Sequence, residues 1–130
     1  MQQLLKKVQE IYEASEQGNI GKMLILLGED FVAYLPKALG GRYEGREGIL
    51  EVVSKMCSSS HIIKKVAKEF VEIENGVIVL GKIEFRGIHP EINTMPFVDI
   101  WRAEDNMVKE VQVLYMDTEV LSDYLKEIEE

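Results

Sequence analysis

"PFVDIWRAED", residues 96–105, and the "NMVKEVQVLY" that follows it predict the central hairpin of the fold. We expect strands over 96–103 and 107–116, because both segments are rich in β-branched and aromatic residues. Asp105-Asn106 lies between them and favours a tight two-residue turn. The elements on either side of this hairpin then indicate the kind of sheet to which it belongs.

The rest of the chain divides into helical and extended segments by the period of its apolar residues. Gly18 is expected to end the first helix and Asn19 to cap the second, and Asn75-Gly76 is typical of a hairpin turn. We expect helices over 3–17, 20–28, 46–58 and 117–130, strands over 30–36, 61–74 and 77–87, and loops over 37–45 and 87–95.

The helices precede and follow the long strands instead of alternating with them, which is typical of an α+β fold. We therefore predict a cone-shaped, curved antiparallel sheet wrapped around the N-terminal helices, with a C-terminal helix, in a single domain over 1–130. Helices on one face of a strongly curved sheet tend to leave an apolar cavity at the concave face. Cavities of this kind commonly hold small ligands.

The composition excludes several classes of protein. An apolar fraction of 46% and a charged fraction of 29% are ordinary for a soluble globular protein. The net charge of −8 disfavours nucleic-acid binding, and no apolar run is long enough to span a membrane. The single cysteine, Cys57, excludes an internal disulfide framework and fits the cytoplasm. His61 and His89 lack the spacing of metal ligands, so we expect no metal and no cofactor.

Asp99 is the candidate catalytic residue. Successive side chains of a strand point to opposite faces, so Asp99 shares a face with Phe97 and Trp101. A carboxylate beside aromatic rings is costly to bury. In the cavity it could donate a hydrogen bond as a neutral acid or act as a general base near neutral pH. The structural alternative is that Asp99 binds a hydroxyl, an arginine or backbone groups and only fixes the fold.

The turn determines which residues lie opposite Asp99 on the following strand. With two residues in the turn, Asp99 faces Gln112 and Phe97 faces Leu114. With three residues in the turn, Gln112 would move to the other face. We therefore expect the two-residue turn to place a carboxylate beside an amide, framed by apolar side chains.

Residues from the first helix and the first strand complete the candidate ligand-binding set. Tyr12 could donate a hydrogen bond to a ligand, and Tyr34 could point into the mouth of the cavity. Packing in the core explains both tyrosines at least as well. The candidate substrate-binding residues are Tyr12, Tyr34, Leu35, Phe97, Trp101, Gln112 and Leu114.

Three segments resemble the SnoaL-like branch of the nuclear transport factor 2-like superfamily. They are "EQGNIGKML", "FVAYLP" with "GGRYEGREGI", and "PFVDIWRAEDNMVKEVQVLYMDT", and they occur in the order that the family has. The resemblance implies the cone-shaped fold of polyketide cyclases and ketosteroid isomerase. This fold hosts isomerases, cyclases, dehydratases, hydrolases and inert binding domains, so it does not by itself name the function.

The catalytic groups of these relatives carry over in part. Ketosteroid isomerase has its general base where this chain has Leu35, and its oxyanion-hole tyrosine where this chain has Ile11. Its protonated aspartate aligns with Asp99 if one residue is removed from the following turn. SnoaL-like cyclases often carry His and Asp in an "EHWD" pattern, where this chain has Val111 and Val113. The resemblance therefore implies a pocket more apolar than those of its catalytic relatives.

The leading hypothesis is that the protein binds a small, mostly apolar organic molecule between the helices and the concave sheet. Cyclase-like or isomerase-like proton transfer by Asp99 is one form of this hypothesis. The alternative is a non-catalytic ligand-binding or dimerisation module that kept the fold and lost the chemistry. We also expect a homodimer, because Val98 and Ile100 need cover on the face opposite Asp99 and no helix remains to supply it.

Overall fold

The computed structural model describes residues 2–27, 29–37, 40–56, 62–86, 92–105 and 107–116. The predicted C-terminal helix over 117–130 and the residues Cys57, His61 and His89 lie outside these ranges. The helices and strands are α1 (Gln2–Glu16), α2 (Ile20–Leu27), β1 (Val32–Tyr34), β2 (Arg42–Glu44), α3 (Gly45–Met56), β3 (Ile62–Ile73), β4 (Gly76–Arg86), β5 (Ile92–Glu104) and β6 (Met107–Tyr115).

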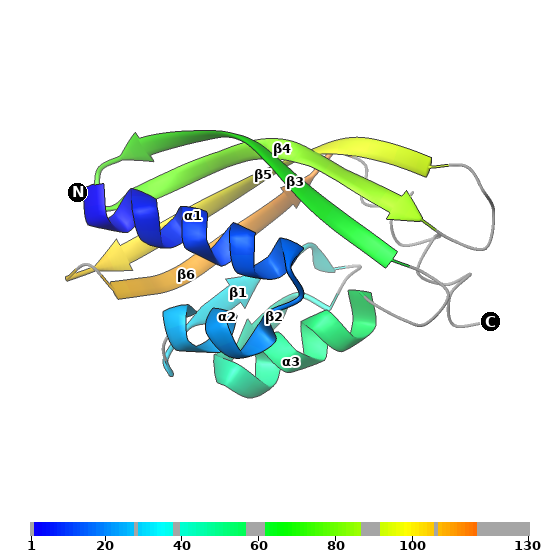
Figure 1. Cartoon of the computed structure of the whole chain (residues 1–130). Helices are drawn as coiled ribbons and strands as arrows, with labels where there is room; N and C mark the ends of the chain where they lie inside the picture. The colour runs from blue at the N-terminus through cyan, green and yellow to red at the C-terminus, as the bar shows by residue number, and fades with distance from the viewer. Residues whose placement is uncertain are drawn as a thin grey trace.

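The six strands form one curved sheet in the order β2-β1-β6-β5-β4-β3 (Figure 1). All neighbours are antiparallel except β1 and β6, which are parallel, so the prediction of a wholly antiparallel sheet is wrong in this detail. A parallel pair needs a long connection, and α3 with the four strands β2, β3, β4 and β5 supplies it here. The predicted α+β fold with a curved sheet around N-terminal helices is confirmed.

A short strand, β2, replaces part of the loop that was expected over 37–45. Gly40 and Gly41 have φ values of 108° and 76°, which glycine adopts without steric cost. These two residues reverse the chain, and the Leu35 amide then donates to the Gly41 carbonyl at 2.7 Å. The reversal allows β2 to pair with β1.

The helix α1 lies across the inner, concave face of the sheet, close to β3 and β4, while α2 and α3 lie near the short strands (Figure 1). Leu4, Val8 and Tyr12 recur at helical spacing and are buried against the sheet. Gly18, with φ of 69°, ends the turn after α1 as predicted. Asn19 caps α2, because its side-chain oxygen accepts the Lys22 amide at 3.1 Å.

The turn between β3 and β4 lies one residue earlier than predicted. Ile73 already pairs with Gly76, so the two turn residues are Glu74 and Asn75. Asn75 takes the positive φ, 55°. Gly76 belongs to the strand because a Cβ there would lie 2.4 Å from the carbonyl oxygen of Trp101. The glycine therefore permits close approach of two strands, and does not form the turn.

The β5–β6 hairpin contains a bulge that changes the predicted pairing. Glu104 pairs with Met107, as a two-residue turn requires, but Lys109 is an extra residue in β6. Beyond this bulge, Asp99 faces Val113, so the expected Asp99–Gln112 pair is wrong. Because a shift of one residue reverses every side chain, Gln112 lies on the outer face.

The same shift applies to the other pair predicted from the turn. Phe97 faces Tyr115 and not Leu114, which is 44% exposed on the outer face beside Gln112. Trp101 pairs with Val111, where a two-residue turn without a bulge would have placed Glu110. The inner face of β6 is therefore formed by Val111, Val113 and Tyr115.

The strand β3 contains a second bulge, at Lys68. Ala67 pairs with Gly81, and Lys65 pairs with Ile83. Gly81 and Ile83 both belong to the residues of β4 that face the concave side of the sheet. Without the extra residue, the alternation that starts from Phe70 would have directed Lys64 inward and Lys65 outward. The bulge thus places the Lys65 side chain on the concave face. None of the described helices is long and apolar enough to cross a membrane.

Candidate functional site

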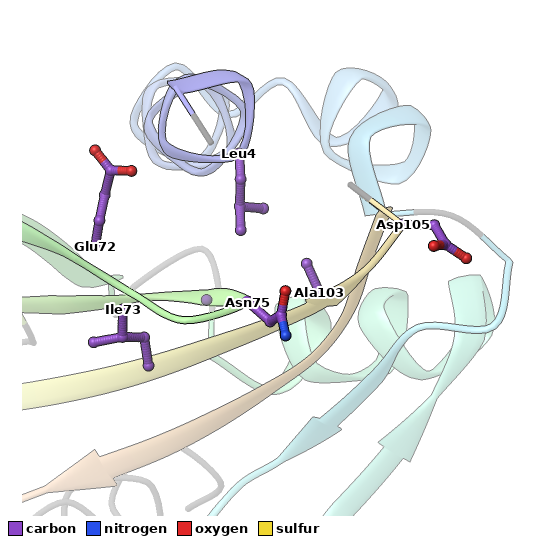
Figure 2. A pocket seen from close by; sticks show the side chains of 7 residues that line it. Leu4, Glu72, Ile73, Asn75, Ala103 and Asp105 are labelled. Atoms are coloured by element: carbon purple, nitrogen blue, oxygen red, sulfur yellow. The ribbon is translucent and has the colours of Figure 1, made fainter.

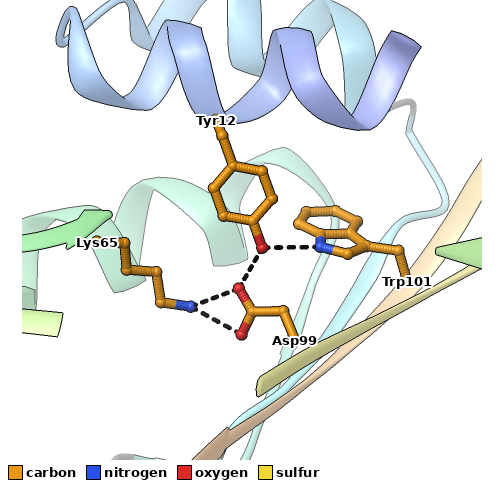
Figure 3. A network of polar contacts seen from close by, with 4 residues as sticks. All are labelled: Tyr12, Lys65, Asp99 and Trp101. Carbon is orange, nitrogen blue, oxygen red and sulfur yellow. Dashed lines mark hydrogen bonds and ion pairs between the residues drawn. The ribbon is translucent and has the colours of Figure 1, made fainter. Parts of the chain in front are cut away.

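Four side chains from α1, β3 and β5 meet at the inner face of the sheet, below the helix (Figure 3). Tyr12 points down from α1, Lys65 reaches across from β3, and Asp99 and Trp101 rise from β5. Asp99 is 1% exposed and is the buried charged residue of the described core. We call these four residues, Tyr12, Lys65, Asp99 and Trp101, the inner network.

Each polar hydrogen at the centre of this network has an identified acceptor. The Lys65 ammonium lies 2.9 Å from both carboxylate oxygens of Asp99. The Tyr12 hydroxyl donates to Asp99 Oδ2, and the Trp101 indole donates to the Tyr12 oxygen at 2.9 Å. Buried charges need a partner and hydrogen bonds together, and Asp99 has both.

Burial and charge act together on the protonation of the network. Burial first, and then the charge of Asp99, raise the pKa of Tyr12 well above its ordinary value of 10.0. Burial is the largest single influence on the pKa of Lys65 and lowers it, but the charge of Asp99 and the contacts with Asp99 and Tyr115 together raise it by more, so the net shift is upward from 10.5. At neutral pH Lys65 is therefore an ammonium and Tyr12 is a neutral phenol.

An aromatic ring and a glycine beside Lys65 support its ammonium next to Asp99. Its ammonium lies 4.7 Å from the centroid of the Phe97 ring, a favourable cation–π distance. Gly81 lies beside this ring, and a Cβ there would meet Phe97 Cε2 at 2.8 Å and the Val66 carbonyl at 2.2 Å. Because Gly81 on β4 has no side chain, the Phe97 ring fits beside it and supports the Lys65 ammonium.

Tyr115 extends the site beyond the inner network. It pairs with Phe97 across β5 and β6, and the centroid of its ring lies 5.4 Å from the Lys65 ammonium. Hydrogen bonding with the Tyr115 hydroxyl also helps to raise the pKa of Lys65. Burial raises the pKa of Tyr115, and the charge of Lys65 partly opposes this effect. Tyr115 is partly exposed, unlike Asp99.

The structure separates the predicted site residues into two groups. Tyr12, Phe97, Asp99 and Trp101 come together on the inner face, where Trp101 also stacks on Phe31 at 5.9 Å between ring centroids. The outer face carries Gln112, Leu114 and Tyr34, of which Tyr34 is 40% exposed. Leu35 is partly buried at the edge of the core, and it lies just after β1.

Lys65 and Tyr115 are site residues that the sequence interpretation missed. In "IIKKVAKEF" two adjacent lysines give no indication of which one turns inward, and the bulge at Lys68 decides this. In "VQVLY" the assumed register favoured Leu114, and the bulge at Lys109 brings in Tyr115 instead. A pairing pattern that allows for bulges would have been needed to find either residue.

The pocket that the structure describes lies near the two hairpin turns, at the end of the sheet where β3 meets β4. Leu4 points into it from α1, and Glu72, Asn75, Ala103 and Asp105 surround it (Figure 2). Its volume is about 50 Å³, which suits a few water molecules but not an organic ligand. Three or more metal-ligating side chains do not gather anywhere in the described ranges.

The inner network is a polar cluster without net charge on an otherwise apolar face of the sheet. Its positive and negative charges cancel, and Asp99 is enclosed by Tyr12 and Lys65. Lys65 keeps 22% of its side chain exposed, so it is the charged member of the network that a molecule on the inner face could approach. Such an arrangement can bind and polarise an acceptor atom more readily than it can remove a proton.

Sequence comparison assigns the family. The profile of the SnoaL-like domain matches residues 8–111, which is most of the chain. The chain belongs to the SnoaL-like family. A search of curated proteins finds no match.

Solved structures agree with this assignment at the level of the fold. A nuclear transport factor 2-like protein of unknown function from Burkholderia pseudomallei K96243 is 21% identical, with a TM-score of 0.84 over 96% of this chain and 98% of that chain. TerC, co-crystallised with polyporic acid, is 20% identical, with a TM-score of 0.80 over 95% and 98%. A provisionally assigned polyketide cyclase from Xanthomonas campestris pv. campestris is 18% identical, with a TM-score of 0.74 over 95% and 97%.

Proposed function

We propose that this SnoaL-like protein binds a small, mostly apolar organic molecule on the concave face, above the Lys65–Asp99 pair. The observation that carries the proposal is the contrast in exposure within that pair, 22% for the Lys65 side chain and 1% for Asp99. An ion pair inside an apolar face is costly to desolvate and contributes little net stability, so its presence favours a functional role.

The surroundings of the pair support an apolar ligand. Phe97, Tyr115 and Phe70 lie around the network, and rings of this kind supply most of the contact area in small-molecule sites. TerC, which shares the fold, was crystallised with polyporic acid. Cys57 is the single cysteine, so we propose that binding takes place in the reducing cytoplasm.

We assign Asp99 the role of a buried counter-ion for Lys65. A general base must reach the proton that it removes, and the oxygens of Asp99 are occupied by Lys65 and Tyr12. Proton transfer by Asp99 stays a prediction, and these contacts favour the non-catalytic alternative.

Trp101 provides a direct test of ligand binding, because it is the single tryptophan and belongs to the network. We would titrate the protein with polyporic acid and follow the tryptophan fluorescence, with N-acetyltryptophanamide as the control for light absorption by the ligand. Native mass spectrometry of the freshly purified protein would detect co-purified molecules. Saturable quenching or a bound small molecule is expected. Linear quenching equal to that of the control, with no bound molecule, would contradict the proposal.

We also propose that the outer face of the sheet is covered by a second copy of the chain. On this face Val71 of β3 and Leu114 of β6 are 45% and 44% exposed, and Met116, which follows β6, is 77% exposed. Large apolar side chains exposed on one face of a sheet are typical of a protein interface. Light scattering should give twice the chain mass of 14.9 kDa at micromolar concentration, and a Leu114→Glu variant should give the monomer. A wild-type monomer would exclude the homodimer.

A further inference from the structure

The two edges of the sheet differ in length. At one edge β2 has three residues, whereas at the other β3 has twelve (Figure 1). Every second residue of an edge strand directs its N–H and C=O groups away from the sheet, so a long edge is able to pair with another chain. Within the described ranges, β3 has no strand partner other than β4 and no backbone hydrogen bond outside that pair. A second polypeptide could therefore extend the sheet at β3.

The composition of β3 favours such pairing. Five of its twelve residues are β-branched, and residues of this type suit an extended, paired backbone. Three lysines and two glutamates leave β3 with a net charge of +1, whereas the whole chain carries −8. Two copies of this edge would thus repel each other little. The β-branched residues are Ile62, Ile63, Val66, Val71 and Ile73.

The bulge interrupts this edge at its middle. Lys68 is the extra residue between Ala67, which pairs with Gly81, and Glu69, which pairs with Leu80. A bulge bends its strand and increases the twist. The edge therefore offers two short stretches, residues 62–67 and 69–73, in place of one long one. A regular strand of another chain cannot follow it across the bulge.

We propose that the extra residue at Lys68 prevents the free edge of β3 from pairing with the same edge of a second copy of the chain. The contact that it prevents is antiparallel and isologous, with the two β3 strands side by side across a two-fold axis. This contact would consist of backbone hydrogen bonds at the edge of the sheet. It is thus separate from the apolar contact proposed for the outer face.

Two alternative deletions remove the extra residue. Each one shortens β3 by one residue, so the pairs Lys65–Ile83 and Phe70–Val79 then belong to one uninterrupted register, and Lys65 stays on the inner face. Deletion of Lys68 leaves the glutamate opposite Leu80, and deletion of Glu69 leaves the lysine there. The two variants therefore have the same backbone and opposite charges at one position.

Light scattering at micromolar concentration would measure the effect. The parent chain is the wild type if it is a monomer, and Leu114→Glu otherwise. Both deletions should give twice the mass of the parent, because each chain has one long edge and that edge is used up in a symmetric pair. Lys68→Ala is the matched control. It removes the charge but keeps the extra residue, so it should keep the mass of the parent.

A proline locates the contact at the edge. The Val66 carbonyl oxygen points to β4, where it would lie 2.2 Å from a Cβ at Gly81. By alternation the Ala67 N–H points to the free edge, and proline lacks this group. Ala67→Pro added to either deletion should restore the mass of the parent. Circular dichroism and the fluorescence of Trp101 would show whether each variant keeps the fold and the inner network.

Every other result contradicts the inference. Two folded deletion variants with the mass of the parent would show that the bulge does not control the edge. Association of Lys68→Ala, or of only one of two folded deletion variants, would assign the effect to charge. Association that Ala67→Pro does not reverse would place the contact elsewhere. Unfolding of both deletion variants would mean that the fold itself requires the extra residue.

Discussion

The hairpins β3–β4 and β5–β6 have the same construction and differ in where their pairing shifts. Each has a two-residue turn and one extra lysine, Lys68 in β3 and Lys109 in β6. Lys109 lies close to the β5–β6 turn, so the pairing of almost all of β6 is shifted by one residue from the pairing that the turn alone would give. Lys68 lies in the middle of β3, so only the half of the strand farther from the turn, from Ile62 to Ala67, is shifted.

The difference decides what each hairpin contributes to the site. The bulge at Lys109, close to its turn, places Gln112 outward and Tyr115 inward, which gives the site a neutral phenol beside Lys65. The bulge at Lys68, farther from its turn, places Lys65 inward, which gives the site a positive charge. Two hairpins with similar turns therefore deliver different chemistry to Asp99, because a single inserted residue reverses all side chains beyond it.

The largest expected effect comes from removing the charge that β3–β4 contributes. Lys65→Met should lower the free energy of unfolding by about 3–5 kcal/mol, because it leaves the carboxylate of Asp99 buried without its counter-ion. Urea unfolding at pH 7 would measure the loss. The matched control is Lys64→Met, on the exposed side of the same strand, which should change stability by less than about 0.5 kcal/mol.

A double variant sharpens this prediction. Lys65→Met combined with Asp99→Asn removes both charges but keeps an acceptor for the Tyr12 hydroxyl. It should regain most of the stability lost in Lys65→Met, since the unpaired charge and not the missing contact is the main cost. If the two losses simply add, the pair is not energetically coupled and the view of Asp99 as a counter-ion is wrong.

The sequence was sufficient for the overall architecture and for three of the four residues of the inner network, Tyr12, Asp99 and Trp101. The helical period of Leu4, Val8 and Tyr12 and the two-residue turn at 105–106 gave the correct types and order of the described helices and long strands, while the short strand β2 was not predicted. Asp99 and Trp101 share a face because they lie on one strand, where alternation holds without a break. The residues that pair across neighbouring strands could not be predicted, because a bulge changes the pairing and leaves little signal in the sequence.

Gly81 tests how the Lys65 side chain is accommodated. Gly81→Ala should destabilise the protein by about 2–3 kcal/mol, because the added Cβ would lie 2.2 Å from the Val66 carbonyl and 2.8 Å from Phe97. Thermal unfolding would measure the effect. In the matched control, Gly21→Ala, the nearest atom is Asn19 Oδ1 at 3.8 Å, and a helical alanine there should stabilise by about 0.5–1 kcal/mol. Equal effects at the two glycines would contradict the close packing inferred at Gly81.

Removing the hydroxyl from each of the two inner-face tyrosines, Tyr12 and Tyr115, should lower the free energy of unfolding by different amounts. Tyr12→Phe should cost about 1–2 kcal/mol, because the indole of Trp101 loses its acceptor and Asp99 loses a donor in a fully buried place. Tyr115→Phe should cost less than about 1 kcal/mol, since Tyr115 is partly exposed and water can replace its hydroxyl. Chemical unfolding of both variants would rank them, and a larger loss for Tyr115→Phe would contradict the view that Tyr12 is the more deeply buried hydrogen-bonding group.

The smallest effect is the dependence of stability on alkaline pH. Tyr12 and Lys65 both have a folded-state pKa above the ordinary values of 10.0 and 10.5. In the unfolded chain each group loses its proton near its ordinary pKa, while the folded protein still holds it. The stabilisation is therefore complete below about pH 10, and it is lost as the pH rises from there through the folded-state pKa values. A single proton changes the free energy of unfolding by at most about 1.4 kcal/mol per pH unit. Urea unfolding between pH 8 and pH 11 should thus show a shallower decline above pH 10 for Tyr12→Phe than for the wild type. Parallel curves would mean that the Tyr12 phenol is no harder to ionise in the fold than in the free chain, and that the inner network does not hold its proton.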